Sequence, residues 1–449
     1  MDLRVIPHRA IQKANFAALR WKISPKKDNP FFHLFLLLFH RRFFSFWAPG
    51  SESSGISKFL YFLYNKIMFA IIFTYTGTVI ADLCENYRDL VMATDDGCYI
   101  VGALIVIFKL INFQLRRDRI EHLMNRIYEP VRMLLRSSDK AVVTLVKSFV
   151  LYEMGTVFIL WSIGAFLIAA SVIFPPTENG SLPIRAKYPF DSRVSPMHEV
   201  AFSIEATALT SIVTAIWVMD IVVMGFCRYT ILQLQILGSN YMNCRNSLSE
   251  RGYLRLPESS LATSFISAED DFVIRTFVPF CSEESTESED SFDKRFKTCV
   301  KHHHRLIRIV DDINELFSSG MLVQLCASTS MICLVAFQAV LGANENSSFA
   351  QYAVFFGSVF CQLWCWCWFG NALIYESDSL ATSQWFSGWE DEKDISSVAS
   401  LITMSLIRTR RPMGLAAGSF YTMSLGMFIT ILKSSYSIFA LLTAVNDEP

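Results

Sequence analysis

The sequence predicts an all-α membrane protein with seven transmembrane helices, and three observations support this fold class. First, its 449 residues are 52% hydrophobic and only 18% charged, which is too apolar for a soluble chain of this length. Second, seven apolar stretches approach the roughly 20 residues that a helix needs to cross a bilayer. Third, basic residues are concentrated in connections between spans, and a chain with seven spans places these connections on the same side of the membrane.

The predicted spans begin near residue 60 and end near residue 445. In chain order they cover about Leu60–Ala81, Cys98–Leu115, Lys147–Phe174, Val200–Phe226, Phe317–Leu341, Gln351–Tyr375 and Leu415–Val445. The last two are rich in aromatic residues and in Gly, Ser and Ala, which suit close helix packing in lipid. Phe31–Trp47 is apolar too, but histidines and arginines interrupt it, so we expect an amphipathic helix at the membrane interface.

The distribution of charge predicts the side of the membrane that each connection occupies. Arginines crowd the connection between the second and third spans, and Arg408, Arg410 and Arg411 lie between the sixth and seventh, so both should be cytoplasmic. The connection between the first two spans is acidic and should lie outside. Met1–Asp28 has no cleavable signal sequence, so we expect the N-terminus to stay in the cytoplasm. Because the number of spans is odd, the C-terminus is then predicted to be extracellular.

Two N-x-S sequons, at Asn179 and Asn346, fall in connections that this topology places outside, so we predict glycosylation at both. On the cytoplasmic side, the acidic run Ser282–Asp290 cannot bury a core, and we expect disorder there. The chain then divides into five segments. They are a cytoplasmic N-terminal segment with its interfacial helix (1–58), transmembrane helices one to four (59–226), a partly disordered cytoplasmic loop with the start of a helix (227–315), transmembrane helices five to seven (316–445) and an extracellular tail (446–449).

The sequence lacks the usual signatures of catalysis and of metal binding. It contains no Gly-rich phosphate loop, no H-E-x-x-H pattern and no array of Cys-x-x-Cys pairs, so it predicts no enzyme, no cofactor and no metal site. The consecutive histidines His302, His303 and His304 point in three directions on a helix, which does not suit one metal ion. A formal net charge of -1 gives no reason to expect nucleic acid as a partner.

Ionisable residues within the predicted spans are informative because burying a charge in lipid is costly. Asp220 in the fourth span and Lys433 in the seventh meet this description. For Asp220 we expect a structural pair in the cytoplasmic half, since no chain of acidic residues continues it through the other spans. Lys66 and Lys109 lie nearer the cytoplasmic ends, where a long side chain can reach the interface.

The C-terminal third carries short motifs in a particular order. They are His304-Arg305-Leu306-Ile307, Leu316-Phe317, Gln324, Cys367-Trp368-Phe369-Gly370-Asn371, Ser377, Trp385, Arg411-Pro412, Lys433-Ser434-Ser435-Tyr436-Ser437 and Leu441-Leu442. Together they resemble the signature of the insect odorant receptor family over about His304 to Leu442. Before His304 the resemblance rests on topology and on looser matches such as Trp47-Ala48-Pro49.

This resemblance implies a subunit of a tetrameric, ligand-gated cation channel in the plasma membrane of olfactory sensory neurons. The tail from Tyr436 to Thr443 differs from the ending of the family's shared co-receptor, so we interpret the chain as a tuning subunit. The implied partners are the co-receptor, a volatile odorant and membrane lipids. The cytoplasmic ends of helices four to seven should hold the subunits together, and helix seven should line the pore.

The family places its odorant pocket in the outer halves of helices two, three, four and six. An odorant is small and apolar, so we expect an enclosed aromatic pocket with one or two hydroxyls. The residues of this sequence in those stretches are Tyr99, Gly102, Phe158, Trp161, Ser162, Thr207, Thr210, Tyr352, Phe355 and Phe356.

In helix seven, Ser435, Phe439, Leu442 and Thr443 fall on one helical face. If this face lines the pore, Phe439 forms a hydrophobic constriction and the two hydroxyls meet hydrated cations. The alternative is that the same face packs on neighbouring helices.

A seven-helix receptor that signals through a G protein is the competing class. The predicted cytoplasmic N-terminus argues against it. So does the lack of Asp-Arg-Tyr after the third span and of Asn-Pro-x-x-Tyr at the end of the seventh. A transporter is a weaker alternative, since the two halves show neither a repeat nor paired broken helices.

Overall fold

The computed structural model describes residues 55–447, apart from 136, 138, 174–181, 183, 193, 246–273, 275, 281–290, 342–345 and 393–394. The expected interfacial helix at Phe31–Trp47, the acidic run Ser282–Asp290 and the sequon at Asn179 lie outside the described residues. Asn346 is the first residue of a helix.

Seven helices within the described part of the chain are long and apolar enough to cross a membrane, which confirms the predicted all-α fold with seven spans. They are α3 (Gly55–Asn86), α4 (Leu90–Leu115), α6 (Lys140–Ile173), α7 (Met197–Met242), α8 (Phe292–Leu341), α9 (Asn346–Trp385) and α11 (Leu425–Asp447). Two shorter helices, α5 (Arg117–Leu134) and α10 (Ile395–Thr409), lie between them, with a 3-10 turn η5 (Trp389–Asp391) and two short strands, β1 (Ala416–Ala417) and β2 (Tyr421–Thr422).

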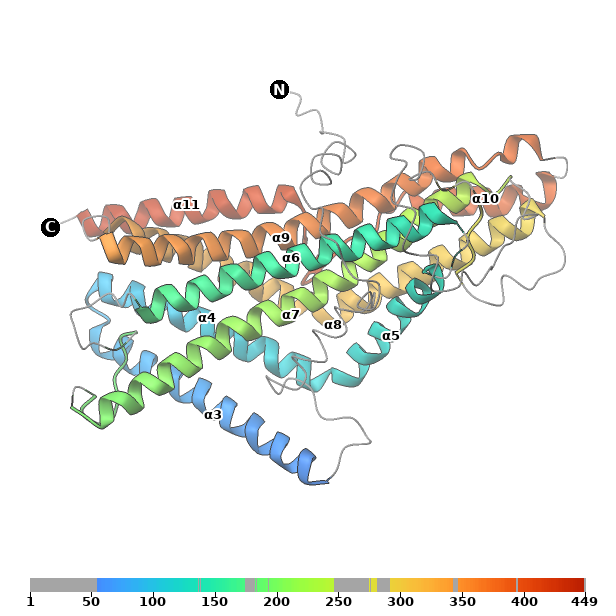
Figure 1. Cartoon of the computed structure of the whole chain (residues 1–449). Coiled ribbons are helices and arrows are strands. Elements are labelled where there is room, and N and C mark those ends of the chain that lie inside the picture. Colours follow the sequence, from blue (N-terminus) through green and yellow to red (C-terminus); the bar gives the residue numbers. More distant parts are fainter. Residues whose placement is uncertain are drawn as a thin grey trace.

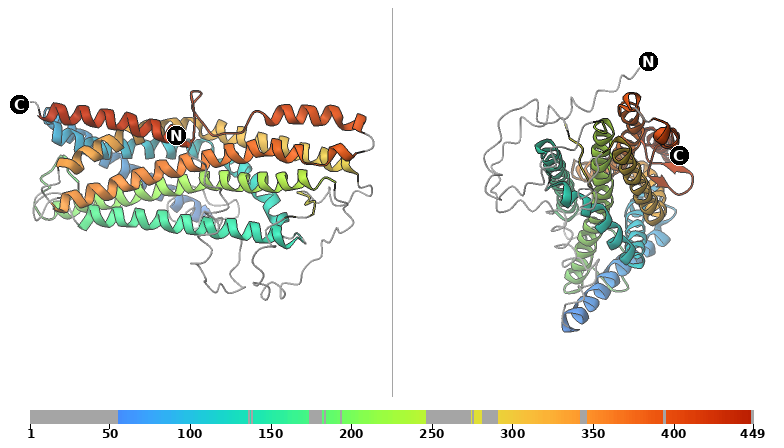
Figure 2. Two further views of the ribbon diagram at one scale, coloured as in Figure 1. Left: turned by 90° about the horizontal axis from the view of Figure 1, so that it is seen from above. Right: turned by 90° about the vertical axis from the view of Figure 1, so that its right-hand side faces the viewer.

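The helices α6, α7, α8 and α9 form a bundle of nearly parallel rods, and α3 slants away from it (Figures 1 and 2). At 1.5 Å per residue, the 46 residues of α7 and the 50 of α8 give lengths of about 70 Å and 75 Å. The hydrocarbon core of a bilayer is only about 30 Å thick. Each of these helices therefore continues well beyond the membrane.

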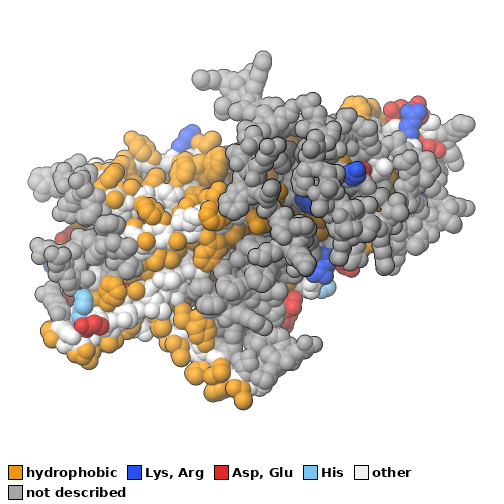
Figure 3. Space-filling model, viewed as in Figure 1, with side chains coloured by type: hydrophobic (Ala, Val, Ile, Leu, Met, Phe, Trp, Pro, Cys, Tyr) orange, Lys and Arg blue, Asp and Glu red, His pale blue; other side chains and the backbone are white. Residues whose placement is uncertain are grey.

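The exposed surface follows the same division. Figure 3 shows hydrophobic side chains across the half of the molecule that holds α4, α6 and α11, whereas most visible Lys and Arg side chains lie toward the other end. This distribution matches a membrane around the first half and water around the second. Basic Arg408 and Arg411 flank the end of α10, in the half that the charge pattern assigns to the cytoplasm.

Two of the predicted spans are parts of longer helices. The fourth, Val200–Phe226, is continued by α7 to Met242, and the fifth begins in α8 at Phe292 instead of Phe317. Much of the segment that we expected to be a loop is therefore helical. These extensions are covered by protein instead of lipid, so polar residues within them have partners; Asn240, for example, donates to the Val278 carbonyl at 2.7 Å and accepts from the Val278 amide at 2.8 Å.

The predicted seventh span is shorter than expected because its first residues form a hairpin. Strands β1 and β2 pair antiparallel, with Ala416 opposite Thr422, and Gly418 turns between them at φ +65°. The Gly418 amide donates to the Ser318 carbonyl of α8 at 3.0 Å, which holds the turn against the bundle. The helix α11 starts only at Leu425.

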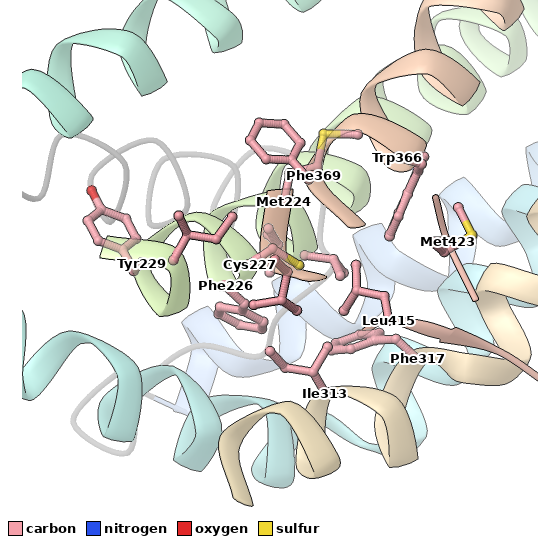
Figure 4. Packing of buried hydrophobic residues seen from close by; sticks show 14 of the residues in the cluster. Met224, Phe226, Cys227, Tyr229, Ile313, Phe317, Trp366, Phe369, Leu415 and Met423 are labelled. Carbon is pink, nitrogen blue, oxygen red and sulfur yellow. The ribbon is translucent and has the colours of Figure 1, made fainter. Parts of the chain in front are cut away.

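The hydrophobic core lies where α7, α8, α9 and the hairpin meet (Figure 4). Phe317 of α8 packs against Phe226 of α7 and Phe113 of α4, with ring centroids 6.2 Å and 5.4 Å apart. Leu415 and Met423 of the hairpin are fully buried in the same cluster. This core lies between the apolar half of the bundle and the half that carries most of the visible basic side chains.

Candidate functional site

A partly open cavity lies between six helices in the apolar half of the bundle. It holds about 720 Å³ of space not filled by atoms, counted with its opening, and its walls come from α3, α4, α6, α7, α8 and α9. Most of the lining is apolar, and the large aromatic side chains are Tyr75, Tyr99, Trp217 and Phe355.

Contacts behind the cavity hold its aromatic wall in place. Tyr99 of α4 and Phe355 of α9 lie with ring centroids 5.9 Å apart, and the Tyr99 hydroxyl accepts from the Gln351 amide at 3.2 Å. Next to them, the Tyr352 hydroxyl donates to Asp95 at 2.7 Å. The contacts therefore fix α9 against α4 along the cavity.

Trp217 reaches the cavity because α6 passes close to it at a glycine. A Cβ atom on Gly164 would lie 2.9 Å from two atoms of the Trp217 ring, which is closer than real contacts allow. The absence of a side chain at Gly164 thus leaves room for the indole of Trp217, which also lines the cavity.

A chain of polar side chains forms the inner end of the cavity. Lys109 and Asp220 make an ion pair at 2.5 Å, and both side chains are almost fully buried. Gln362 donates to the other Asp220 oxygen at 2.5 Å and lines the cavity. The expected structural pair of Asp220 is confirmed, whereas the interpretation of Lys109 as an interface anchor is wrong, because Lys109 is buried beneath the cavity.

The C-terminal end of α3 and the N-terminal end of α7 are tied together by the residues around Arg185. Arg185 forms an ion pair with Asp82 of α3 at 3.1 Å, and the Ile184 amide donates to Glu205 of α7 at 3.1 Å. Lys187 adds an exposed pair with Glu85. Burial raises the pKa of Tyr188 in the same segment, and its ring packs on Phe190.

The comparison with known proteins decides the family. A family model described as 7tm odorant receptor matches residues 89–436, which is most of the chain. The chain belongs to the seven-transmembrane odorant receptor family. Drosophila melanogaster odorant receptor 13a is 22% identical over 386 residues, which cover 82% of this chain and 84% of that protein.

Other odorant receptors agree in length and fold. Odorant receptor 47b of Drosophila melanogaster is 21% identical over 409 residues, 90% of this chain and 89% of that protein. The solved structure of the insect olfactory receptor OR5 from Machilis hrabei in complex with eugenol has the same fold, with a TM-score of 0.70 at 16% identity over 90% of this chain and 94% of that one. The Drosophila melanogaster odorant receptor coreceptor is 25% identical over 154 residues, 33% of this chain and 30% of that protein.

The structure brings some of the predicted pocket residues of this odorant receptor together and separates others. Tyr99, Gly102 and Phe355 line the cavity. The remaining seven do not line it: Tyr352 and Phe356 pack beside it, Trp161 and Thr210 are half-buried, and Phe158, Ser162 and Thr207 are exposed. Phe158, at 73% exposed, points away from the bundle, as a lipid-facing side chain does.

The sequence analysis missed four lining residues that shape the cavity. These are Tyr75, Trp217, Gln324 and Gln362. Tyr75 and Gln324 come from helices one and five, which the family resemblance left out of the pocket. A signal was present for the two glutamines, since an uncharged amide within an apolar span needs a partner inside the protein.

The predicted pore residues of α11 face the rest of the subunit. Ser435 is 1% exposed, and its hydroxyl donates to the Thr329 carbonyl of α8 at 3.2 Å. Phe439, Leu442 and Thr443 are half-buried on the same face. Within one subunit this face therefore packs on neighbouring helices, which was the alternative interpretation, and the opposite face with Ser437 and Leu441 is open.

Proposed function

We propose that this odorant receptor is the tuning subunit of a cation channel in the plasma membrane of olfactory sensory neurons, gated by a volatile odorant and assembled with the odorant co-receptor as a heterotetramer. The mostly apolar cavity with its four aromatic side chains carries the proposal, because its apolar walls suit a small uncharged molecule. The same fold in a receptor solved with eugenol supports it. Neither an enzymatic activity nor a cofactor is part of this function.

The packing of α11 supports assembly with other subunits. Within the subunit, only 17% of the most apolar stretch of α11 is buried, compared with 83% of the most apolar stretch of α7. Exposed apolar residues such as Leu441 and Val445 would contact neighbouring subunits or the pore. We therefore assign the pore lining to the open face of α11, with Ser437, Leu441 and Ala444, in place of the face that carries Ser435 and Phe439.

An odorant opens the channel only if it binds the open arrangement more tightly than the closed one. The cavity touches α8 and α9, and both helices also contact α11. A shift of these two helices around the ligand is therefore a direct route to the pore helix. The proposed topology also leaves Asn179 and Asn346 outside, available for glycosylation.

The test is whole-cell recording from cells that express this chain with and without an insect odorant co-receptor during exposure to a panel of volatiles. We expect a rapid cation current that requires both chains and persists when G-protein signalling is blocked. The matched control is a variant of the chain with Gly102→Trp, which fills the cavity beside Met331. A response that disappears with G-protein blockade would overturn the channel assignment and favour the alternative class of receptor.

A further inference from the structure

The polar end of the cavity contains one buried oxygen that lacks a hydrogen-bond donor. Gln324 of α8 lines the cavity and is only 2% exposed. Its amide nitrogen donates to Gln362 Oε1 at 3.2 Å and to Ser328 Oγ at 3.0 Å. Its Oε1 atom has no partner among the described residues.

The ion pair beneath the cavity determines the orientation of this amide. The Asp220 carboxylate, held by Lys109, only accepts hydrogen bonds, so Gln362 must turn its NH2 group toward it. Gln362 then presents Oε1 to Gln324, so Gln324 must donate a hydrogen bond from its own NH2 group. The chain of donors ends at Gln324 Oε1, a buried acceptor without a donor on a residue that lines the cavity.

An unpaired buried carbonyl oxygen is unfavourable, and most such groups in native proteins have a partner. None of the described residues donates a hydrogen bond to this oxygen. A hydroxyl group on a bound ligand supplies the missing donor, whereas the oxygen of an ether, ester, ketone or aldehyde only accepts and would meet another acceptor.

We propose that this receptor is tuned to small apolar volatiles that carry a hydroxyl group, alcohols or phenols, and that Gln324 is the residue that selects the hydroxyl. This inference rests on the proposed function and names the ligand class of its cavity. The hydrocarbon part of the ligand lies against Tyr99, Trp217 and Phe355, and the hydroxyl turns toward α8 and donates to Gln324 Oε1.

The experiment compares ligands of matched shape on the wild-type chain expressed with the co-receptor. The panel pairs volatile alcohols and phenols with their methyl ethers and with the corresponding aldehydes, for example octanol with octyl methyl ether and octanal. We expect the half-maximal concentration of the best alcohol to be about tenfold lower than that of its ether or aldehyde, the size of one net hydrogen bond in a buried site.

Two variants locate the effect. Gln324→Met keeps the shape of the side chain and removes the acceptor, so it should abolish the difference in half-maximal concentration between an alcohol and its ether. Gln235→Met is the matched control, because Gln235 bonds Glu376 away from the cavity and the same chemical change there should alter nothing. Surface labelling shows that each variant reaches the membrane.

The outcomes separate the two levels of the proposal. Equal potency of alcohol and ether on the wild-type chain would overturn the hydroxyl selection while the channel function stands. A preference that survives Gln324→Met would overturn the role of Gln324. No current from the wild-type pair with any volatile would overturn the proposed function and the inference with it. The wild-type comparison needs no variant, so it decides the matter even if Gln324→Met fails to fold.

Discussion

Lys109 of α4 and Asp220 of α7 form an ion pair at 2.5 Å directly beneath the cavity, with side chains 7% and 1% exposed. The indole of Trp366 lies 5.9 Å from the Lys109 nitrogen and shields it further. The pair joins two helices that the sequence separates by more than a hundred residues. It also orients the polar end of the cavity, so its loss should affect both stability and ligand recognition.

Removing one member of this pair should be costly, because the other charge stays buried without a partner. We expect Asp220→Asn to lower the free energy of unfolding by about 3–5 kcal/mol and to reduce surface expression strongly. The double variant Lys109→Met with Asp220→Asn should recover much of this loss. Thermal unfolding of the purified receptor in detergent measures both effects.

The exposed pair between Arg119 and Glu315 is the control for this prediction. Its side chains are 55% and 61% exposed, so Glu315→Gln should change the stability by less than about 1 kcal/mol. If Asp220→Asn is as mild as Glu315→Gln, the buried pair does not hold α4 to α7.

A methyl group at Gly164 should push Trp217 into the cavity. Overpacking of this kind costs about 1–3 kcal/mol, and we expect Gly164→Ala to raise the half-maximal odorant concentration by about tenfold. Gly155→Ala on the same helix is the matched control, because a Cβ there meets nothing within 4 Å. Equal potency of the two variants in current recordings would show that Trp217 does not shape the binding site.

Gly370 should be intolerant of any side chain because α9 meets the hairpin there. A Cβ on Gly370 would lie 2.7 Å from the Met423 Cβ and would overlap the Met423 carbonyl oxygen. Backbone cannot move aside as a flexible side chain can, so we expect Gly370→Ala to lower the melting temperature and the amount of receptor at the surface. Gly357→Ala, in the same helix with open space around it, should behave like the wild type.

The two faces of α11 should differ in their access to water. We expect Leu441→Cys to react with a charged thiol reagent and to change the odorant-evoked current. Ser435→Cys should not react, because that position is buried against Thr329. The wild-type chain treated with the same reagent controls for the exposed native cysteines Cys84 and Cys326. The reverse pattern would restore the Ser435 face as the pore lining.

The seven spans could be predicted because the hydropathy of a lipid-facing helix stands out over about 20 residues. The lengths of the helices that contain these spans could not be predicted. Beyond Phe226, α7 is buried by other helices instead of lipid, and such burial tolerates Gln233 and Asn240 once they find partners. The hairpin was missed because Leu415 to Thr422 contains no charged residue that would separate it from the following span; the turn at Gly418 and the start of α11 depend on contacts with α8.

The cavity could be predicted only in part because sequence does not fix the rotation of a helix that is apolar all round. The sequence of α6 carries apolar residues on every side, so nothing in it separates exposed Phe158 from Trp161, which is half-buried. The resemblance gave the right helices for Tyr99, Gly102 and Phe355. The partners of Asp220 lie on other helices, as does Gln362, which accepts from Gln324, and one sequence without contacts does not pair them.

Little of α11 is buried within its own subunit, and this affects how its position in the bilayer is stabilised. A helix with few contacts inside its own subunit gains most of its remaining packing energy from neighbours, so its order depends on the concentration of subunits in the bilayer. Dilution of the receptor in detergent should loosen α11 before any other span, while α7, enclosed on all sides, keeps its shape. The helix that we assign to the pore is then the part of the molecule that becomes fully ordered only when the subunits assemble.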